Sequence, residues 1–503
     1  MLLADVVDTS AAVAATRSRT AKVAAIAELL RRVADSEPDA VPVVTSYVSG
    51  TLRQRRTGLG WRSLQELPEP AEQATLEVAE VDAAFDRIAE LTGAGSQLAR
   101  AGATRDLFGR ATADEQRWLR GIVTGEVRQG ALDAVVQEAL AAAGAVPVAA
   151  VRRAAMMAGS SVDIAAAALT GDLDALAVFT LQVGRPVLPM LASTAPTVEA
   201  AMTKAGGGEV AIDTKLDGIR IQVHRRGDDV LVVTRSLDDV TDRHPEVVEI
   251  ARALPCHDVV LDGEVLALGP DGRPRPFQET ASRAATAGGT VRLTPAFFDL
   301  LHLDGRDLVD APTTERLDAL ERVVPEQHRV PRLVTADPDE AEAFAAEVLA
   351  LGHEGVVVKS LNAPYAAGRR GATWVKVKPV HTLDLVVLAV ERGSGRRSGW
   401  LSNIHLGARD GDSLVMLGKT FKGMTDEILT WQTERFRELQ MDDDGYVVTV
   451  RPEQVVEIAF DGVQRSTRYP GGVALRFARV VRYRDDKTPA EADTLETVRG
   501  YLP

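Results

Sequence analysis

The sequence predicts three domains: an all-α domain over residues 1–190, an α+β domain over residues 191–382, and a small C-terminal β-barrel of the OB-fold type over residues 383–503. Three observations predict this division. Apolar residues recur at helical spacing in the first third, short β-rich runs surround one clear helix in the middle, and short strands alternate with Gly-rich turns at the end. A chain of 503 residues is also too long for one hydrophobic core.

Helical periodicity dominates the first third of the chain. Between residues 19 and 35 the apolar positions fall on one helical face: Val23, Ile26, Leu29, Leu30 and Val33. The segments 78–91, 114–124 and 132–143 have the same pattern. Three prolines then interrupt residues 184–196, and such a segment is typical of a connection between domains.

The rest of the chain is rich in strand signals. In the middle domain the predicted strands are 219–223, 230–234, 259–268, 296–301, 355–359 and 374–377, with a helix at 338–351. In the last domain they are 385–390, 413–417, 446–450, 455–460 and 475–483. Five short strands in about 120 residues are the size and spacing of a closed OB-type barrel.

Composition limits the possible functions. Lys and Arg number 58 against 72 Asp and Glu, a formal charge of −14, which argues against a uniformly basic surface for nucleic acid but permits a local basic groove. The single cysteine excludes an internal disulfide and a multi-cysteine zinc site. The first residues are acidic where a signal peptide needs cations, and the apolar run 141–151 is too short to cross a membrane. We therefore expect a cytoplasmic protein without membrane segments.

The clearest motif is Lys-Leu-Asp-Gly-Ile-Arg at residues 215–220. If the segment is a strand that turns at Asp217-Gly218, then Asp213, Lys215 and Asp217 share one face. Two interpretations remain open for this motif alone: a lysine that performs chemistry, or an ordinary hairpin with an exposed lysine.

Six further segments follow the lysine motif in order: Thr-Arg-Ser at 234–236, Leu-Asp-Gly-Glu at 261–264, Phe-Phe-Asp-Leu-Leu at 297–301, Glu-Gly-Val-Val-Val-Lys at 354–359, Trp-Val-Lys-Val-Lys at 374–378 and Arg-Asp-Asp-Lys at 484–487. This ordered set resembles the nucleotidyltransferase motifs of ATP-dependent DNA ligases, whose superfamily includes RNA ligases and mRNA capping enzymes. The resemblance runs from about Pro186 to the end and includes the segments 418–425 and 460–466.

The resemblance implies a helical DNA-binding domain at 1–190, as in bacterial and archaeal members, an adenylation domain at 191–382 and an OB-fold domain at 383–503. The implied activity is the sealing of nicks in duplex DNA during replication, repair and recombination. Lys215 would attack the α-phosphate of ATP, the AMP would pass to the 5′-phosphate at the nick, and the 3′-hydroxyl would displace it. The implied partners are ATP, Mg²⁺ and nicked duplex DNA, encircled by a monomer.

The resemblance also assigns roles to individual residues. Glu264 and Glu354 would be the Mg²⁺ ligands, because hard cations prefer carboxylate oxygens, and Glu264 would also lie near the ribose. Phe298 would stack on the adenine. Asp213 stands where the family mostly has Glu, and a backbone contact to adenine there would survive the shorter side chain.

Eight cations are expected to contact the nucleotide: Arg220, Arg235, Lys359, Arg370, Lys376, Lys378, Arg484 and Lys487. Lys359 would orient the α-phosphate, and the nearby charges of Lys376, Lys378 and Mg²⁺ would favour the neutral amine that a nucleophilic lysine needs. By resemblance, the segment with Arg484 and Lys487 swings over the pyrophosphate during lysine adenylylation and turns away when DNA is engaged.

Three other classes of protein share part of this pattern. An mRNA-capping-type nucleotidyltransferase shares the lysine motif but uses GTP. A non-catalytic DNA-binding relative would keep the fold without the chemistry, which the intact charged motifs argue against. An NAD-dependent ligase carries a four-cysteine zinc site, and the single cysteine of this chain excludes that site.

Overall fold

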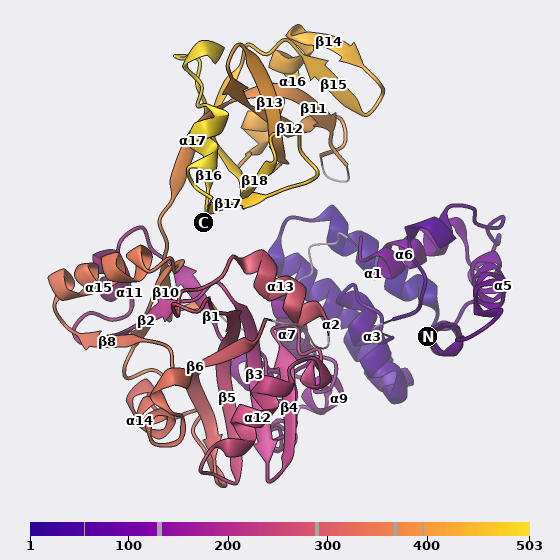
Figure 1. The fold of residues 1–503 in the computed structure, drawn as a ribbon. Coiled ribbons are helices and arrows are strands. Elements are labelled where there is room, and N and C mark those ends of the chain that lie inside the picture. The colour runs from indigo at the N-terminus through magenta and orange to yellow at the C-terminus, as the bar shows by residue number, and fades with distance from the viewer. Residues whose placement is uncertain (55, 128–132, 287–290, 367–369, 395–396, 503) are drawn as a thin grey trace.

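The computed structural model describes residues 1–54, 56–127, 133–286, 291–366, 370–394 and 397–502. Figure 1 shows a helical N-terminal part, a middle part with two sheets, and a strand-rich C-terminal part joined to the middle by a single connection. The multidomain architecture expected from the sequence is confirmed. Among the described residues, no helix is both long and apolar enough to cross a membrane.

The N-terminal part consists of helices around one apolar core. They are α1 (Leu3–Ala15), α2 (Arg19–Ser36), α3 (Val41–Val48), α4 (Val78–Glu90), α5 (Ser96–Gly109), α6 (Ala113–Thr124), α7 (Asp133–Ala143), α8 (Val148–Ala158), α9 (Ala165–Leu169) and α10 (Leu173–Ala177). The predicted face of α2 is buried except at the half-buried Val23, and Leu29, Leu30 and Val33 are fully covered. Local signals define the ends: α6 begins with a capping box between Thr112 and Glu115 and ends at Gly125 in the left-handed conformation.

The helical part and the middle part share a small core. Met156 and Met157 of α8 pack with Met190, which lies in the proline-rich connection, and with Tyr365 and Trp374, which lie beyond it. An ion pair between Arg153 and Asp310 (Nη1–Oδ1 2.5 Å) lies beside it. The two parts are therefore joined by buried apolar surface.

The middle part contains two five-stranded sheets. The smaller has the order β1-β10-β9-β2-β8, and the larger has the order β4-β3-β5-β6-β7. Its elements are β1 (Leu191–Thr194), α11 (Val198–Lys204), β2 (Val210–Lys215), β3 (Ile219–Arg226), β4 (Asp229–Thr234), α12 (Pro245–Ala253), β5 (Asp258–Ala267), α13 (Phe277–Ala285), β6 (Leu293–Leu303), β7 (Arg306–Asp307), α14 (Thr313–Val323), β8 (Arg332–Thr335), α15 (Pro338–Ala350), β9 (Gly355–Ser360) and β10 (Arg370–Val377). Helices α11 and α15 bury one face of the smaller sheet, and α12, α13 and α14 contribute to the core of the larger.

The C-terminal part is rich in strands, as expected. Its elements are β11 (His381–Arg392), β12 (Leu401–Asp410), β13 (Ser413–Thr420), α16 (Asp426–Glu438), β14 (Gln440–Asp443), β15 (Val447–Val450), β16 (Val455–Phe460), β17 (Gly462–Arg465), β18 (Val473–Arg476), β19 (Arg479–Tyr483) and α17 (Leu495–Arg499). The main sheet runs β13-β12-β11-β15-β14, with β16 joining β11 to β19, and β17 and β18 form a separate hairpin. Within the described residues these pairings form part of a barrel wall rather than a closed ring.

The predicted strand at 475–483 is wrong as one element. Phe477 has a φ of +56°, a left-handed conformation that a β-strand does not accommodate, so the chain breaks there into β18 and β19. The break turns Arg476 and Phe477 toward the middle part of the molecule, where both line the pocket described next.

Candidate active site

A pocket of about 530 Å³ opens where the two sheets of the middle part meet the β17–β18 hairpin. It gathers most of the residues expected from the sequence: Asp213, Lys215, Arg220, Arg235, Glu264, Phe298, Glu354, Lys359, Lys376 and Lys378. These residues come from strands β2, β3, β4, β5, β6, β9 and β10 or the turns beside them. The fold thus brings motifs separated by more than 160 residues into one site.

Lys215 lies at the end of β2 and is held by a carboxylate. Its Nζ pairs with Oε2 of Glu354, while Oε1 of the same residue pairs with Nζ of Lys378. Lys378 also reaches Asp461 of the C-terminal part at 3.1 Å. One glutamate therefore orients two lysines. Burial opposes the charge on Lys378, but its ion pairs with Glu354 and Asp461 raise its pKa above the ordinary value.

Glu354 reaches this position because of the residue after it. Gly355 starts β9 with a φ of +134°, and a Cβ there would lie 2.2 Å from the carbonyl oxygen of Val377. The backbone N–H of Glu354 donates to the carbonyl oxygen of Lys215 at 3.0 Å. Strands β2, β9 and β10 can therefore converge at Lys215 only with a glycine at this position.

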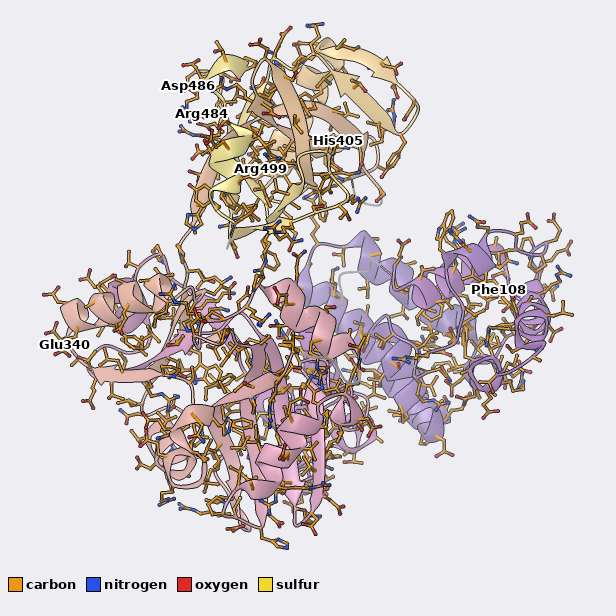
Figure 2. All side chains as sticks on the ribbon, viewed as in Figure 1. Phe108, Glu340, His405, Arg484, Asp486 and Arg499 are labelled. Atoms are coloured by element: carbon orange, nitrogen blue, oxygen red, sulfur yellow. The ribbon has the colours of Figure 1, made fainter. Side chains whose placement is uncertain are left out.

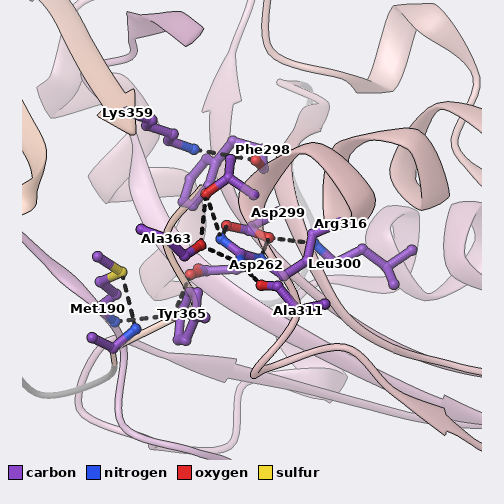
Figure 3. Close-up of polar contacts among 12 residues, drawn as sticks. Met190, Asp262, Phe298, Asp299, Leu300, Ala311, Arg316, Lys359, Ala363 and Tyr365 are labelled. Atoms are coloured by element: carbon purple, nitrogen blue, oxygen red, sulfur yellow. Dashed lines mark hydrogen bonds and ion pairs between the residues drawn. The ribbon is translucent and has the colours of Figure 1, made fainter. Parts of the chain in front are cut away.

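A second ion cluster lies deeper in the pocket. The carboxylate of Asp213 accepts from Arg332 (Nη2–Oδ2 2.9 Å) and pairs with Lys359 (Nζ–Oδ2 2.6 Å). Burial disfavours the charge on Asp213, but the two cations lower its pKa below the usual range. Both cations also donate to the carbonyl oxygen of Phe298, Arg332 at 3.0 Å and Lys359 at 3.2 Å, and Figure 3 shows the lysine aimed at that oxygen.

Aromatic rings form one wall of the pocket. Phe298 meets Trp374 edge to face, with ring centroids 5.9 Å apart, and Trp374 meets Tyr365 in the same way at 5.7 Å. The amine of Lys359 lies 4.2 Å from the centroid of the Trp374 ring. A flat, partly apolar wall beside cations suits a ligand that combines an aromatic base with phosphates.

Arg220 belongs to this wall, although its guanidinium is already engaged. It forms two bonds with Asp262, Nε–Oδ1 at 3.0 Å and Nη2–Oδ2 at 2.6 Å, and donates to the carbonyl oxygen of Met190 at 2.6 Å. The hydroxyl of Tyr365 donates to the same Asp262 at 2.6 Å (Figure 3). Arg220 is thus fixed in place by residues that the sequence analysis did not select.

Glu264 projects from β5 beside Lys215 and Arg220, without an ion pair among the described residues. Burial raises the pKa of Glu264 to about 7, the carboxylate of Glu354 adds to the rise, and the charges of Lys215 and Arg220 oppose it. Within the described part of the chain, no three His, Cys, Asp or Glu side chains gather into a ready-made metal site. Two carboxylates nevertheless fit Mg²⁺, which commonly takes one or two protein carboxylates and completes its shell with phosphates and water.

The C-terminal part closes one side of the pocket. Arg476 of β18 forms two bonds with Asp217, Nη1–Oδ2 at 2.5 Å and Nη2–Oδ1 at 3.0 Å. Its guanidinium lies 5.1 Å from the ring centroid of Phe277, and the neighbouring Phe477 is 55% exposed. The aspartate of the lysine motif therefore serves as a contact point between two parts of the molecule.

The other expected site residues have different placements. Arg235 and Lys376 line the pocket, and Arg235 is exposed. Arg370 begins β10, and its side chain lies outside the described part of the structure. Arg484 and Lys487 do not line the pocket: both pair with Asp384 in the C-terminal part, at 3.0 Å and 2.6 Å, and Figure 2 places Arg484 on the outer side of that part.

The sequence analysis missed three pocket residues and two residues that support the pocket. Phe277, Arg476 and Phe477 line the pocket and belong to no quoted motif. Asp262, which lies inside a quoted motif, and Arg332, which lies in none, hold the pocket residues Arg220 and Asp213. No local signal in the sequence marks them, because their role depends on which strands and domains meet.

The comparisons with known proteins agree with this geometry. Three family models match in chain order: DNA ligase N terminus at residues 62–141, ATP dependent DNA ligase domain at 189–378, and ATP dependent DNA ligase C terminal region at 397–487. A "Probable DNA ligase" of Nocardioides sp. is 70% identical and covers 100% of this chain and 99% of its own. The chain belongs to the ATP-dependent DNA ligase family. Membership in this family places it among enzymes.

Other family members are also similar over their full length. Proteins named "Probable DNA ligase" from Kineococcus radiotolerans and Beutenbergia cavernae are 67% and 64% identical, each with 99% of both chains covered. Two solved structures, Pmar-Lig_Pre and Pmar-Lig_PreS3, are each 18% identical and cover 95% of this chain and 99% of their own, with TM-scores of 0.63 and 0.62. At that identity they support the fold of this ligase-family chain.

Proposed function

We propose that this protein seals nicks in duplex DNA through a covalent lysyl-AMP intermediate on Lys215. The single observation that carries the proposal is the surroundings of Lys215: a nucleophile held by Glu354 at the mouth of a pocket with an aromatic wall and several cations. A lysine amine can attack the α-phosphate of ATP, forming a P–N bond while the bond to pyrophosphate breaks. AMP then passes to the 5′-phosphate of the nick, and the 3′-hydroxyl displaces it.

The other pocket residues fit roles in the same reaction. The adenine would stack on Phe298, Lys359 would contact the α-phosphate, and Arg220, Arg235, Lys376 and Lys378 would contact ribose or phosphate oxygens. Glu264 and Glu354 would hold Mg²⁺, which neutralises phosphate charge when bound. Arg370 remains a candidate phosphate contact.

Arg484 and Lys487 fit a role limited to the first step. They would approach the pyrophosphate only while it leaves, and their pairing with Asp384 would belong to a later stage of the reaction. The corresponding movement would be made by the C-terminal part as an OB-type domain. The proposed domain limits are 1–190, 191–382 and 383–503.

Nicked DNA is the proposed partner, bound by a monomer that surrounds it in the cytoplasm, in replication, repair or recombination. The helical part would supply phosphate contacts despite the net charge of −14. The GTP-using capping reaction is the second candidate for the lysine chemistry. Family membership and the large helical part both favour DNA.

The test is adenylylation with α-labelled ATP and Mg²⁺, followed by denaturation and detection of label on the protein. The wild type should retain the label, whereas Lys215→Ala should form no adduct, because the nucleophile is absent. The variant should still seal a nick that already carries a 5′-AMP. Lys204→Ala is a matched control, because Lys204 is exposed and, within the described part of the chain, its amine bonds only the carbonyl oxygen of Thr194, at 3.1 Å.

Three results would contradict parts of the proposal. Label on Lys215→Ala would identify another lysine as the nucleophile. Label from GTP but not from ATP would favour the capping reaction. Failure of the labelled wild type to seal a singly nicked duplex would exclude ligation as its activity.

A further inference from the structure

The cluster around Asp213 contains more positive than negative charge. Arg332, Lys359 and Asp213 have side chains that are 10%, 2% and 3% exposed, respectively. Two cations share one carboxylate, so the cluster carries a net charge of +1 when all three groups are ionised. The nearest buried acid on β6, Asp299, is already neutralised by Arg316, with Nε–Oδ1 at 2.7 Å (Figure 3).

The guanidinium of Arg332 determines whether the cluster carries a net positive charge. Without its guanidinium, Asp213 and Lys359 would form a one-to-one pair, and the net charge beside the pocket would be zero. Charges interact strongly in a buried site, because little water screens them. Lys359 can therefore attract an anion in the pocket only if another cation compensates Asp213.

The positions of Arg332 and Lys359 indicate that the two cations have different roles. Arg332 comes from β8 and does not line the pocket, whereas Lys359 on β9 does. Arg332 makes two bonds to Asp213 (Nε–Oδ1 2.5 Å and Nη2–Oδ2 2.9 Å), the arrangement that a guanidinium forms best with a carboxylate. Lys359 makes one ion pair, to Oδ2 at 2.6 Å.

We propose that Arg332 is a positioning residue for nucleotide binding, which neutralises Asp213 so that the charge of Lys359 remains available to the α-phosphate of ATP. This inference rests on the proposed function, because it assigns Lys359 to the phosphate. It predicts that the contribution of Arg332 is electrostatic and acts through Asp213.

The first measurement is the KM for ATP in lysine adenylylation, with the inhibition constant of adenosine as a second readout. Arg332→Gln should raise the KM for ATP at least about tenfold, because it removes the excess positive charge. The inhibition constant of adenosine should stay unchanged, since adenosine has no phosphate. Arg332→Lys should keep most of the ATP affinity.

The second measurement is the double variant Asp213→Asn with Arg332→Gln. Removing the acid and the arginine together leaves Lys359 as the one formal charge of the cluster, so the double variant should recover most of the ATP affinity that Arg332→Gln loses. Arg329→Gln is the matched control, since Arg329 lies three residues away, pairs with Glu321 at 3.6 Å and does not line the pocket. Sealing of a pre-adenylylated nick reports whether each variant is folded.

The inference is wrong if Arg332→Gln binds ATP like the wild type, or if it weakens adenosine as much as ATP. It is also wrong if Arg332→Lys fails as completely as Arg332→Gln, because that result indicates a purely structural role. A double variant no better than the single one would equally overturn it. Failure of the wild type to form any adenylate would instead reject the proposed function itself.

Discussion

At the scale of single residues, Glu264 has an unusual environment, because its side chain is half-buried without a paired cation among the described residues. The groups that act on it are Lys215, Arg220, Glu354 and Asp262. Burial raises its pKa to about 7 from an ordinary 4.5. A carboxyl group whose pKa is raised by folding stabilises the fold when protonated, and this contribution is lost as the pH rises through 7.

We therefore predict that Glu264→Gln stabilises the metal-free protein relative to the wild type above pH 7. At pH 5 the two proteins should unfold at similar temperatures, and by pH 8.5 the variant should unfold at the higher temperature. Thermal unfolding in EDTA at both pH values measures this difference. A constant difference across the pH range would show that Glu264 does not titrate in the folded protein near neutrality.

The sequence predicted many pocket residues but few of their partners. Lys215, Glu264 and Glu354 were predicted because they belong to an ordered set of motifs that resembles those of ATP-dependent DNA ligases. Arg332 was missed, because a lone arginine on a short strand looks like an ordinary surface residue until strand β8 pairs with β2. Residue type is visible in a sequence, whereas ion pairing depends on tertiary contacts.

At the scale of elements, the start of β9 controls the position of Glu354. Gly355→Ala should abolish adenylylation and cost about 3 kcal/mol or more in stability, because the new Cβ would overlap the carbonyl oxygen of Val377 at a φ that L-residues rarely adopt. Denaturant unfolding and adenylate formation measure the two effects. Gly371→Ala on the neighbouring strand is the control, since its Cβ would meet no atom closer than 3.6 Å.

An active, stable Gly355→Ala protein would mean that β9 and β10 can separate without loss of the site.

Several strands of this region were predicted closely, for example 219–223 within β3 and 355–359 within β9, because their β-branched residues form short buried runs. The pairing order β1-β10-β9-β2-β8 was not predictable, because it joins segments far apart in the chain.

At the scale of the whole molecule, Arg484 and Lys487 lie away from the pocket, on Asp384. If they act only while pyrophosphate leaves, Arg484→Ala should slow lysine adenylylation by an amount equivalent to about 2–4 kcal/mol and should slow sealing of a pre-adenylylated nick much less. Single-turnover rates of the two steps measure this selectivity.

Asp384→Asn separates this role from a structural one. It removes the ion pairs that hold both cations in the present arrangement but keeps the cations, so adenylylation should not slow. Equal loss of both steps in Arg484→Ala, or the same adenylylation defect in Asp384→Asn, would mean that the segment only stabilises the C-terminal part.

The core shared by α8 and the middle part has a mechanical consequence. Moving the helices away would expose Met156, Met157 and Trp374 to water, whereas the C-terminal part meets the pocket through ion pairs such as Arg476 with Asp217 and Lys378 with Asp461. Ion pairs exchange for water at little cost, but apolar contacts do not. We therefore expect the helical and middle parts to move as one unit, and the last 120 or so residues to move relative to them on the short link before β11.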